Sequence, residues 1–440
     1  MLSQLLLILV LTASIGVQLL SPRLAVLNVW PKTRALHPAL NVGECVRVEG
    51  LEACEDAWVD HKGGKAYLAC SSLQARSVWQ PADSVLDGPS ALSTALLGQK
   101  DTLRLFDFAT NTHEEVALHG MPDTDAEGGW GRVWTHGMDV LVHPPSPSSS
   151  SAGEQPEITI LLISHRPPQP PSSAKQEGAD SVVEVFSSRL GSNEARWVRT
   201  VRHPLLRTPN NLVGDAALLS PSSKGGEEGG EKVGFWLTND HRSKTGWERV
   251  VETVFHAPSE VVYCEADLED TEREAECKVA ADSVMYPNGL AKGPNDLLYS
   301  ASTYTGDITV WEIQHADKTL VPVNSIPIGR PIDNLHPSPS GALYAATFPL
   351  ARAFGAAAPT AKDVDRPRRV KAPVEVWRVG NETGEGQFYG RQFRTSVALA
   401  DPTGEVVSAI TSAAPYGDKL LLTGYFTPHA TVCRLAGVEL

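Results

Sequence analysis

Basic residues are too few for a protein that binds nucleic acid or an anionic membrane through its charge. Lysine and arginine number 38 against 52 aspartates and glutamates, so the formal net charge is −14 at pH 7. Because affinity for polyanions comes from clustered cations, this balance argues against both kinds of partner. Three common catalytic or nucleotide-binding motifs are also missing: the Walker loop, the GxGxxG strand-turn-helix element and the GxSxG elbow.

Long amphipathic helical periods are scarce, and no strict internal repeat is visible. Short segments of alternating polarity, such as TLRLFDF, VGFWLTND and DITVWEI, instead follow one another after residue 40. The 36 glycines and 32 prolines supply frequent turns, and the 42% hydrophobic content suffices for a sizeable core. The pattern predicts an all-β fold, either a sandwich, a barrel or a propeller, with the propeller favoured.

Only one hydrophobic run is long enough to span a bilayer, and it lies at the N-terminus. Residues 1–20 carry no charged side chain, and the first basic residue is Arg23. This run is typical of a signal peptide or an N-terminal signal anchor. We therefore expect entry into the secretory pathway, with the protein secreted or anchored on the lumenal or extracellular side. Association with membrane or lipid through residues 1–20 is then an option.

The remaining chain is predicted to be a lead-in followed by one domain. Residues 21–44 form the lead-in, and residues 45–440 form a single β-propeller domain. Proline-, serine- or glycine-rich stretches and one basic stretch interrupt the strand pattern and predict loop inserts. These inserts lie near residues 144–156, 167–180, 221–231 and 353–373.

Six cysteines in a secreted chain predict disulfides. Cys54 and Cys70 flank the turn HKGGK, and Cys264 and Cys277 lie at the ends of two strand-like segments. Each of these two pairs could face each other across paired strands, although other pairings of the four cysteines stay open. Cys45 and Cys433 would then join the two ends of the domain, which favours a circular array of strands.

Carboxylate and amide side chains recur next to apolar strand residues. They are Glu55-Asp56, Asn210-Asn211, Asn288 and Asp333-Asn334, with His136 in a similar setting. Asn and Asp commonly make turns, so each cluster alone would indicate only a turn. The innermost strands of a propeller meet at its central channel, where clusters far apart in sequence can converge. An all-oxygen set of this kind suits Ca²⁺ rather than zinc.

As an ordered set, these clusters resemble motifs of the paraoxonase (serum arylesterase and lactonase) family. The markers are C-E-D at 54–56, H-G-M at 136–138, V-R-H-P-L-L at 201–206, T-N-D-H at 238–241, P-N-G at 287–289 and I-D-N at 332–334. The resemblance implies a six-bladed β-propeller of four-stranded blades, with two calcium ions in the central tunnel. It also implies an end-to-end disulfide between Cys45 and Cys433.

The resemblance assigns roles residue by residue. It implies a catalytic calcium ion with five ligands, which are Glu55, Asn210, Asn288, Asp333 and Asn334. His136 and His165 correspond to the histidine pair above this ion. A buried structural calcium would be held by Asp56, the backbone carbonyl of Met138 and position 211. Asn211 stands where the family usually has aspartate, which removes one negative charge from that site.

The function that follows is calcium-dependent hydrolysis of lactones and aryl esters, small-molecule substrates. The ion would polarise the carbonyl, and a histidine-assisted water would attack it. Two alternatives stay open: a non-catalytic, calcium-stabilised propeller that binds protein or lipid, and a metal-free enzyme of the strictosidine-synthase type. The triplet at Asn381 is a glycosylation sequon, consistent with secretion.

Overall fold

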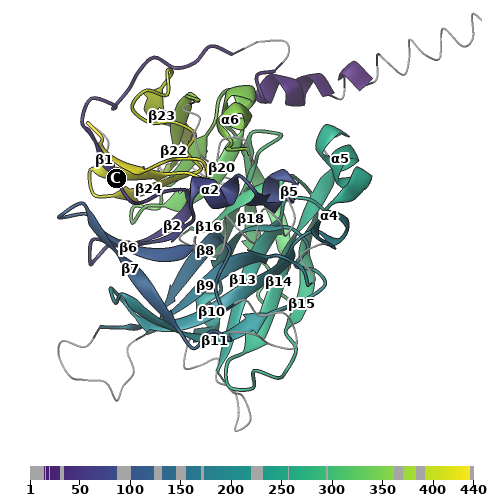
Figure 1. Cartoon of the computed structure of the whole chain (residues 1–440). Coiled ribbons are helices and arrows are strands. Elements are labelled where there is room, and N and C mark those ends of the chain that lie inside the picture. The colour runs from purple at the N-terminus through teal and green to yellow at the C-terminus, as the bar shows by residue number, and fades with distance from the viewer. Residues whose placement is uncertain are drawn as a thin grey trace, which may run out of the picture.

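The computed structural model is described over most of the chain. The described residues are 14, 16–18, 20–29, 34–86, 101–122, 131–144, 155–169, 173–219, 231–255, 257–293, 296–360, 370–382 and 392–436. The described part is dominated by β-sheets, and its helices are short (Figure 1). The predicted all-β class is therefore confirmed.

Four of the sheets are four-stranded and antiparallel. The first contains β12 (Pro209–Gly214), β13 (Lys232–Asn239), β14 (Pro258–Asp267) and β15 (Glu276–Met285). The second contains β16 (Pro287–Lys292), β17 (Leu297–Ser302), β18 (Asp307–Ile313) and β19 (Leu320–Pro327). The third contains β20 (Ile332–Pro337), β21 (Leu343–Thr347), β22 (Val374–Glu382) and β23 (Gln392–Asp401). The fourth contains β24 (Ser412–Tyr416), β25 (Lys419–Thr423), β26 (Ala430–Arg434) and β1 (Cys45–Val48).

An eight-stranded sheet joins two further antiparallel groups. One group is β2 (Cys54–Asp60), β3 (Lys65–Cys70), β6 (Thr102–Asp107) and β7 (Thr112–His119). The other is β8 (Thr135–Val142), β9 (Glu157–Arg166), β10 (Asp180–Arg189) and β11 (Glu194–Val201). A short parallel pairing of β11 with β7 connects them. The arrangement is propeller-like, but it departs from the prediction of six separate four-stranded blades because these two groups merge at their outer edges.

Three helices lie in the upper half of the view in Figure 1, namely α2 (Leu73–Arg76), α5 (Gly246–Phe255) and α6 (Ala351–Ala357). The shorter elements are α4 (Ala174–Glu177), the 3₁₀ turns η1 (Pro81–Asp83) and η3 (Ala216–Leu219), and the paired strands β4 (Trp79–Gln80) and β5 (Val85–Leu86). α4 and part of α6 fall within stretches that were expected to be loops. The alanine-rich sequence ARAFGAA has a high helix propensity, which accounts for α6.

Other parts of the predicted inserts cannot be compared with the structure. Residues 145–154, 170–172, 221–230 and 361–369 lie outside the described residues. The same holds for residues 1–13, which make up most of the predicted signal segment. Among the helices in the described ranges, none has the length and apolar character needed to cross a membrane.

The N-terminal and C-terminal strands of the domain pair with each other. β1 pairs with β26, and Cys45 lies directly opposite Cys433, to which it is joined by a disulfide. Disulfides also join Cys54 to Cys70 across β2 and β3, and Cys264 to Cys277 across β14 and β15. The three disulfides are typical of a protein from an oxidising, extracellular compartment.

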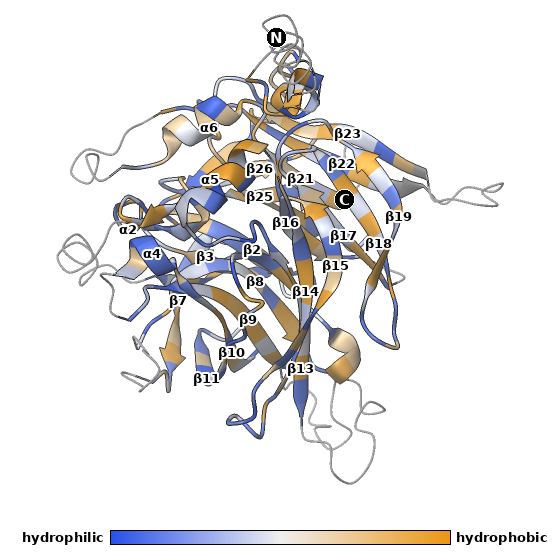
Figure 2. Ribbon diagram, turned by 90° about the vertical axis from the view of Figure 1, so that its right-hand side faces the viewer, coloured by the Kyte–Doolittle hydropathy of each residue, from blue (hydrophilic) through white to orange (hydrophobic). Residues whose placement is uncertain are grey.

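Hydrophobic side chains fill the spaces between neighbouring sheets. Val183 and Val185 of β10 pack in one buried cluster with Phe235 and Leu237 of β13. A second cluster joins β3 to β25 and β26 across the closure of the domain. Figure 2 shows that hydrophobic residues concentrate on the strands. Burial of these faces holds the sheets in fixed positions, so their inner strands are held in place as well.

We expect the Cys45–Cys433 disulfide to stabilise the fold more than a local disulfide does. It closes a loop with a sequence separation of 388, whereas that of Cys264–Cys277 is 13. The chain-entropy model assigns roughly 6 kcal/mol to the first and roughly 3 kcal/mol to the second. Thermal unfolding of the Cys45→Ala/Cys433→Ala variant should therefore show the larger drop in Tm, with Cys264→Ala/Cys277→Ala as the matched control. Equal drops would contradict this account of the closure.

Candidate functional site

Six inner strands form a closed ring at the centre of the described structure. β2, β8, β12, β16, β20 and β24 contact one another in that cyclic order, and β24 returns to β2. Each of these strands lies at the end of its four-stranded group that faces the ring. Side chains that point inward from these strands therefore meet, although they come from segments far apart in sequence.

The pairing of five ring strands with their neighbours is irregular at the predicted site residues. The register shifts between Cys54 and Asp56 in β2, and between Thr135 and Met138 in β8. It also shifts at the corresponding steps of β12, β16 and β20, between Pro209 and Leu212, Pro287 and Leu290, and Ile332 and Leu335. Residues inside such bulges leave the hydrogen-bonded ladder, and their side chains are re-aimed. These shifts enclose Glu55, His136, Asn210, Asn211, Asn288, Asp333 and Asn334.

Glycines in two of these bulges allow the ring strands to approach each other closely. A Cβ atom on Gly289 would lie 2.6 Å from Asn334 Cα and 2.6 Å from the carbonyl oxygen of Asp333. A Cβ atom on Gly137 would lie 2.5 Å from the carbonyl oxygen of Asn210. Both distances are far below van der Waals contact. The H-G-M and P-N-G motifs therefore need glycine for packing around the site.

The five residues predicted to bind the catalytic calcium are all buried in the ring. Three of their oxygen atoms, Glu55 Oε2, Asn210 Oδ1 and Asn288 Oδ1, are buried and have no hydrogen-bond partner. A buried polar atom without a partner costs about 1–3 kcal/mol. Asn334 Nδ2 donates to Glu55 Oε1 over 2.8 Å, which places the amide beside this carboxylate. A hard cation, which prefers oxygen ligands, would supply the partner that these oxygen atoms lack.

The buried carboxylates of the cluster also favour a bound cation. Burial raises the pKa of Glu55 well above its usual range, and the nearby charges of Asp56 and Asp333 raise it further. Burial likewise raises the pKa of Asp333 well above its usual range. Within the described residues, no three His, Cys, Asp or Glu side chains are grouped to hold a metal ion. A cation here would therefore need amide oxygens as well as the two carboxylates.

His136 and His165 lie together, although they come from different strands, β8 and β9. Their rings are 4.8 Å apart between centroids and meet edge to face at 63°. His165 Nδ1 lies 2.9 Å from Ser181 Oγ, which fixes the ring. His165 Nε2 and both ring nitrogens of His136 are buried without a hydrogen-bond partner. Burial lowers the pKa of His136 well below its usual range and that of His165 to about 3, so both rings are neutral near pH 7.

Two residues that the sequence did not single out support this pair. Tyr425 packs edge to face on His136, with ring centroids 5.2 Å apart. The Arg76 guanidinium lies 4.0 Å from the Tyr425 ring centroid and donates to Tyr425 Oη over 3.2 Å. Arg76 also donates to the carbonyl oxygen of Thr135, next to His136. Neither residue belongs to a motif with a recognisable spacing, so only the fold identifies them.

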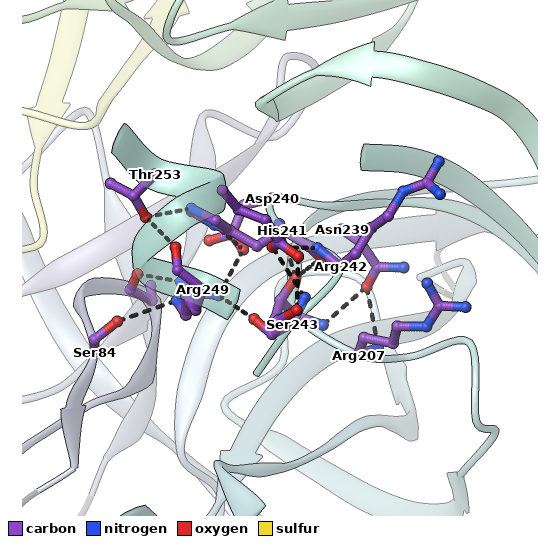
Figure 3. A network of polar contacts seen from close by, with 12 residues as sticks. Ser84, Arg207, Asn239, Asp240, His241, Arg242, Ser243, Arg249 and Thr253 are labelled. Atoms are coloured by element: carbon purple, nitrogen blue, oxygen red, sulfur yellow. Dashed lines mark hydrogen bonds and ion pairs between the residues drawn. The ribbon is translucent and has the colours of Figure 1, made fainter. Parts of the chain in front are cut away.

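Figure 3 shows a buried ionic network around Asp240 and Arg249. Asp240 lines the same small pocket as His165. Asp240 Oδ1 is 3.0 Å from His241 Nδ1 and 3.5 Å from Arg249 Nη1 of α5. Burial alone would raise the pKa of Asp240, but Arg249 and His241 outweigh it and hold this pKa well below its usual range. Arg249 also donates to Ser84 Oγ and to the carbonyl oxygen of Ala82. The network therefore anchors α5 to residues 82–84 and to Asp240, at the end of β13. The T-N-D-H motif contains Asp240 and His241, but the sequence assigned them no role.

A small pocket connects His165 with this network and is lined in part by Ser181, Asp240 and Lys244. A larger cavity of about 570 Å³ lies between α2, α6 and β26. No residue of the oxygen cluster or of the histidine pair lines this larger cavity. The larger cavity is therefore separate from the predicted site residues.

The three residues assigned to a structural calcium also lie together, but in a different way. Asp56 Oδ2 accepts hydrogen bonds from Met138 N over 3.0 Å and from Asn211 Nδ2 over 2.9 Å. Met138 therefore contacts Asp56 through its backbone N–H. The predicted glycosylation site, Asn381, lies in β22, and its Thr383 lies outside the described residues.

Comparison with curated proteins finds a limited similarity. No protein-family model matches the chain. Human serum paraoxonase/arylesterase 1 is 25% identical over 223 residues, which cover 48% of this chain and 51% of that protein. The match therefore spans about half the length of this relative.

Solved structures of low similarity cover nearly the whole chain. A gluconolactonase from Xanthomonas campestris shows 14% identity and a TM-score of 0.37, with 92% of this chain and 99% of that chain covered. An aldose sugar dehydrogenase from Escherichia coli shows 12% identity and a TM-score of 0.43, with 90% and 99% covered. A luciferin-regenerating enzyme shows 11% identity and a TM-score of 0.42, with 90% and 96% covered. These scores are too low to assign an activity.

We expect Gly289→Ala to disrupt the site, because its new methyl group would collide with the backbone of Asn334 and Asp333. Backbone atoms cannot rotate away as a side chain can, so overpacking should lower the free energy of unfolding by about 1–3 kcal/mol. The matched control is Gly355→Ala in α6, where nothing lies within 4 Å of the added Cβ atom. Chemical denaturation of both variants tests this, and equal stabilities would contradict the close approach of β16 and β20.

Proposed function

We propose that the chain is a six-bladed β-propeller that hydrolyses lactones and aryl esters with the help of calcium. In this interpretation, the eight-stranded sheet counts as two blades joined at their edges. The observation that carries the proposal is the group of three unpartnered, buried oxygen atoms of Glu55, Asn210 and Asn288. His136 of the ring strand β8 and His165 of the neighbouring strand β9 lie together beside them. Both ring nitrogens of His136 and the Nε2 atom of His165 have no hydrogen-bond partner.

The residues that would hold the ion are the five predicted ones, Glu55, Asn210, Asn288, Asp333 and Asn334. Their carboxylate and amide oxygens are the ligands that calcium prefers. A calcium ion bound here would supply the positive charge that polarises an ester carbonyl and stabilises the oxyanion. The formal charges of the two carboxylates would balance that of the ion, and the three neutral amide ligands would add no further negative charge.

His136 is the residue best placed to accept a proton from an attacking water. Its ring is buried, neutral and free of hydrogen bonds at both nitrogens, so it has a lone pair available near pH 7. His165 is oriented by Ser181 and packs against His136, which restricts where the His136 ring can turn. The negative charge of Asp240 would favour a protonated His136 after the transfer, since it raises the pKa of that ring.

A row of mostly buried aromatic side chains lies beside the histidines, and we propose that it forms an apolar wall against which part of a substrate would pack. It begins with Tyr425, which contacts His136, and continues to Phe426 with ring centroids 5.2 Å apart. Phe426 lies 5.3 Å from Phe354, which stacks on Phe348 at 4.1 Å. Binding sites for small molecules are mostly apolar with a few placed polar groups, and this arrangement fits an aryl or alkyl substituent.

The similarity to human serum paraoxonase/arylesterase 1 supports the same reaction class, since that protein's name includes arylesterase activity. We also propose that residues 1–20 direct the chain into the secretory pathway and that Asn381 carries a glycan. The three disulfides support secretion, because such bonds persist in oxidising compartments.

We predict that Glu55→Gln and Asp333→Asn each lower lactone hydrolysis by about 100-fold or more, because each removes one negative ligand from the ion. The measurement is kcat/KM for an aromatic lactone and for phenyl acetate, with bound calcium measured on the same samples. Glu44→Gln is the matched control, since Glu44 is 73% exposed and lies outside the ring. Activity like that of the wild type in both site variants would overturn the metal assignment.

We predict that His136→Gln slows hydrolysis by about 100-fold or more while calcium binding is kept, because the variant removes a general base but no metal ligand. His315→Gln, at an exposed position, is the control. An unchanged rate would remove His136 from the mechanism and leave the metal role intact. If the wild type is folded and binds calcium but hydrolyses neither substrate, a non-catalytic binding propeller becomes the better interpretation.

A further inference from the structure

Asp56 is the only carboxylate among the residues assigned to a deeper, structural ion, and N–H groups already satisfy both its oxygen atoms. Oδ2 accepts from Met138 N and Asn211 Nδ2, at 3.0 and 2.9 Å. Oδ1 accepts from Ala57 N over 2.9 Å, and His336 Nε2 lies 3.5 Å from it. The donors direct the positive ends of their dipoles at the carboxylate. Three of the four lone pairs of the carboxylate are therefore engaged by N–H groups, which leaves one, on Oδ1, for a cation.

Asn211 is the centre of this arrangement. Its Nδ2 donates both to Asp56 Oδ2 and to Asn334 Oδ1, each over 2.9 Å. Its Oδ1 accepts from Leu290 N over 3.2 Å. The opposite orientation of the amide would set Oδ1 against two acceptor oxygens and Nδ2 against a backbone donor. The hydrogen-bond partners therefore fix the orientation, and the NH₂ group lies between the two oxygen atoms.

The oxygen cluster predicted to bind the catalytic calcium differs from Asp56 because some of its oxygen atoms have no hydrogen-bond donor. Glu55 Oε2, Asn210 Oδ1 and Asn288 Oδ1 are buried acceptors without donors, whereas no side-chain oxygen of Asp56 or Asn211 is. Asn334 connects the oxygen cluster with the Asp56 site, because its Nδ2 donates to Glu55 Oε1 and its Oδ1 accepts from Asn211. A continuous chain of hydrogen bonds thus runs from Glu55 through Asn334 and Asn211 to Asp56.

We propose that the Asn211 side-chain amide takes the place of the structural calcium, so that this chain binds one ion in its tunnel rather than two. The amide provides two N–H dipoles at the point where a cation would otherwise hold Asp56 and its neighbours together. An aspartate at position 211 would instead bring a second carboxylate toward Asp56, and a cation would then be needed to offset their repulsion. Asn211 therefore replaces a metal-dependent link by a network of hydrogen bonds.

Calcium stoichiometry tests this proposal without any activity assay. Wild-type protein, dialysed against buffer with calcium at micromolar to millimolar concentrations, should bind one ion per chain by elemental analysis and by calorimetric titration. Asn211→Asp should bind two. Two ions in the wild type would overturn the proposal, and so would a folded Asn211→Asp variant that still binds one.

Two variants show where the single ion lies. Asp56→Asn should keep it, and Glu55→Gln should lose it. Loss in Asp56→Asn together with retention in Glu55→Gln would place the ion at the deeper position and overturn the proposal. A wild type that binds no calcium would contradict the metal role under the proposed function and the count of one ion. In that case, replacement of the deeper ion would be supported if Asn211→Asp gains an ion and overturned if it gains none. The two proposals therefore fail separately.

Discussion

The rest of the site depends on buried oxygen atoms that have no donor within the protein. Glu55, Asn210 and Asn288 each hold one such atom at the centre of the ring, where water is excluded. Buried polar atoms without a partner destabilise the folded state, so such atoms normally bind water, an ion or a ligand. A hard cation would do so, and it would also relieve the repulsion between Glu55 and Asp333.

The fold brings these oxygen atoms together by repeating the same bulge in successive inner strands of the ring. In five inner strands the ladder is interrupted at the residues that face the centre, and Gly137 and Gly289 let adjacent strands come within contact of each other. The uninterrupted pairing of the middle strands and the hydrophobic packing between sheets hold these bulges in place. The Cys45–Cys433 disulfide joins the first and last strands, so the ring has no open end.

The sequence predicted the candidate site where polar residues of the site are adjacent in the chain. The pairs Glu55-Asp56, Asn210-Asn211 and Asp333-Asn334 revealed the oxygen cluster, and the strand pattern revealed the all-β class. Arg76 and Tyr425 could not be found, because each is a single residue that reaches the site only through the fold. The parallel contact of β7 with β11 depends on outer edges meeting, which no local pattern encodes. α5 was not predicted, because it is a single ten-residue helix between segments with a strand pattern.

The rate of aromatic lactone hydrolysis as a function of free calcium concentration tests the central claim most directly. The protein is stripped with a chelator, shown to be folded by circular dichroism, and titrated with calcium in a buffered series. The account predicts a rate near background without calcium and a saturable recovery as calcium is restored. A folded, calcium-free protein that keeps its full rate would contradict it.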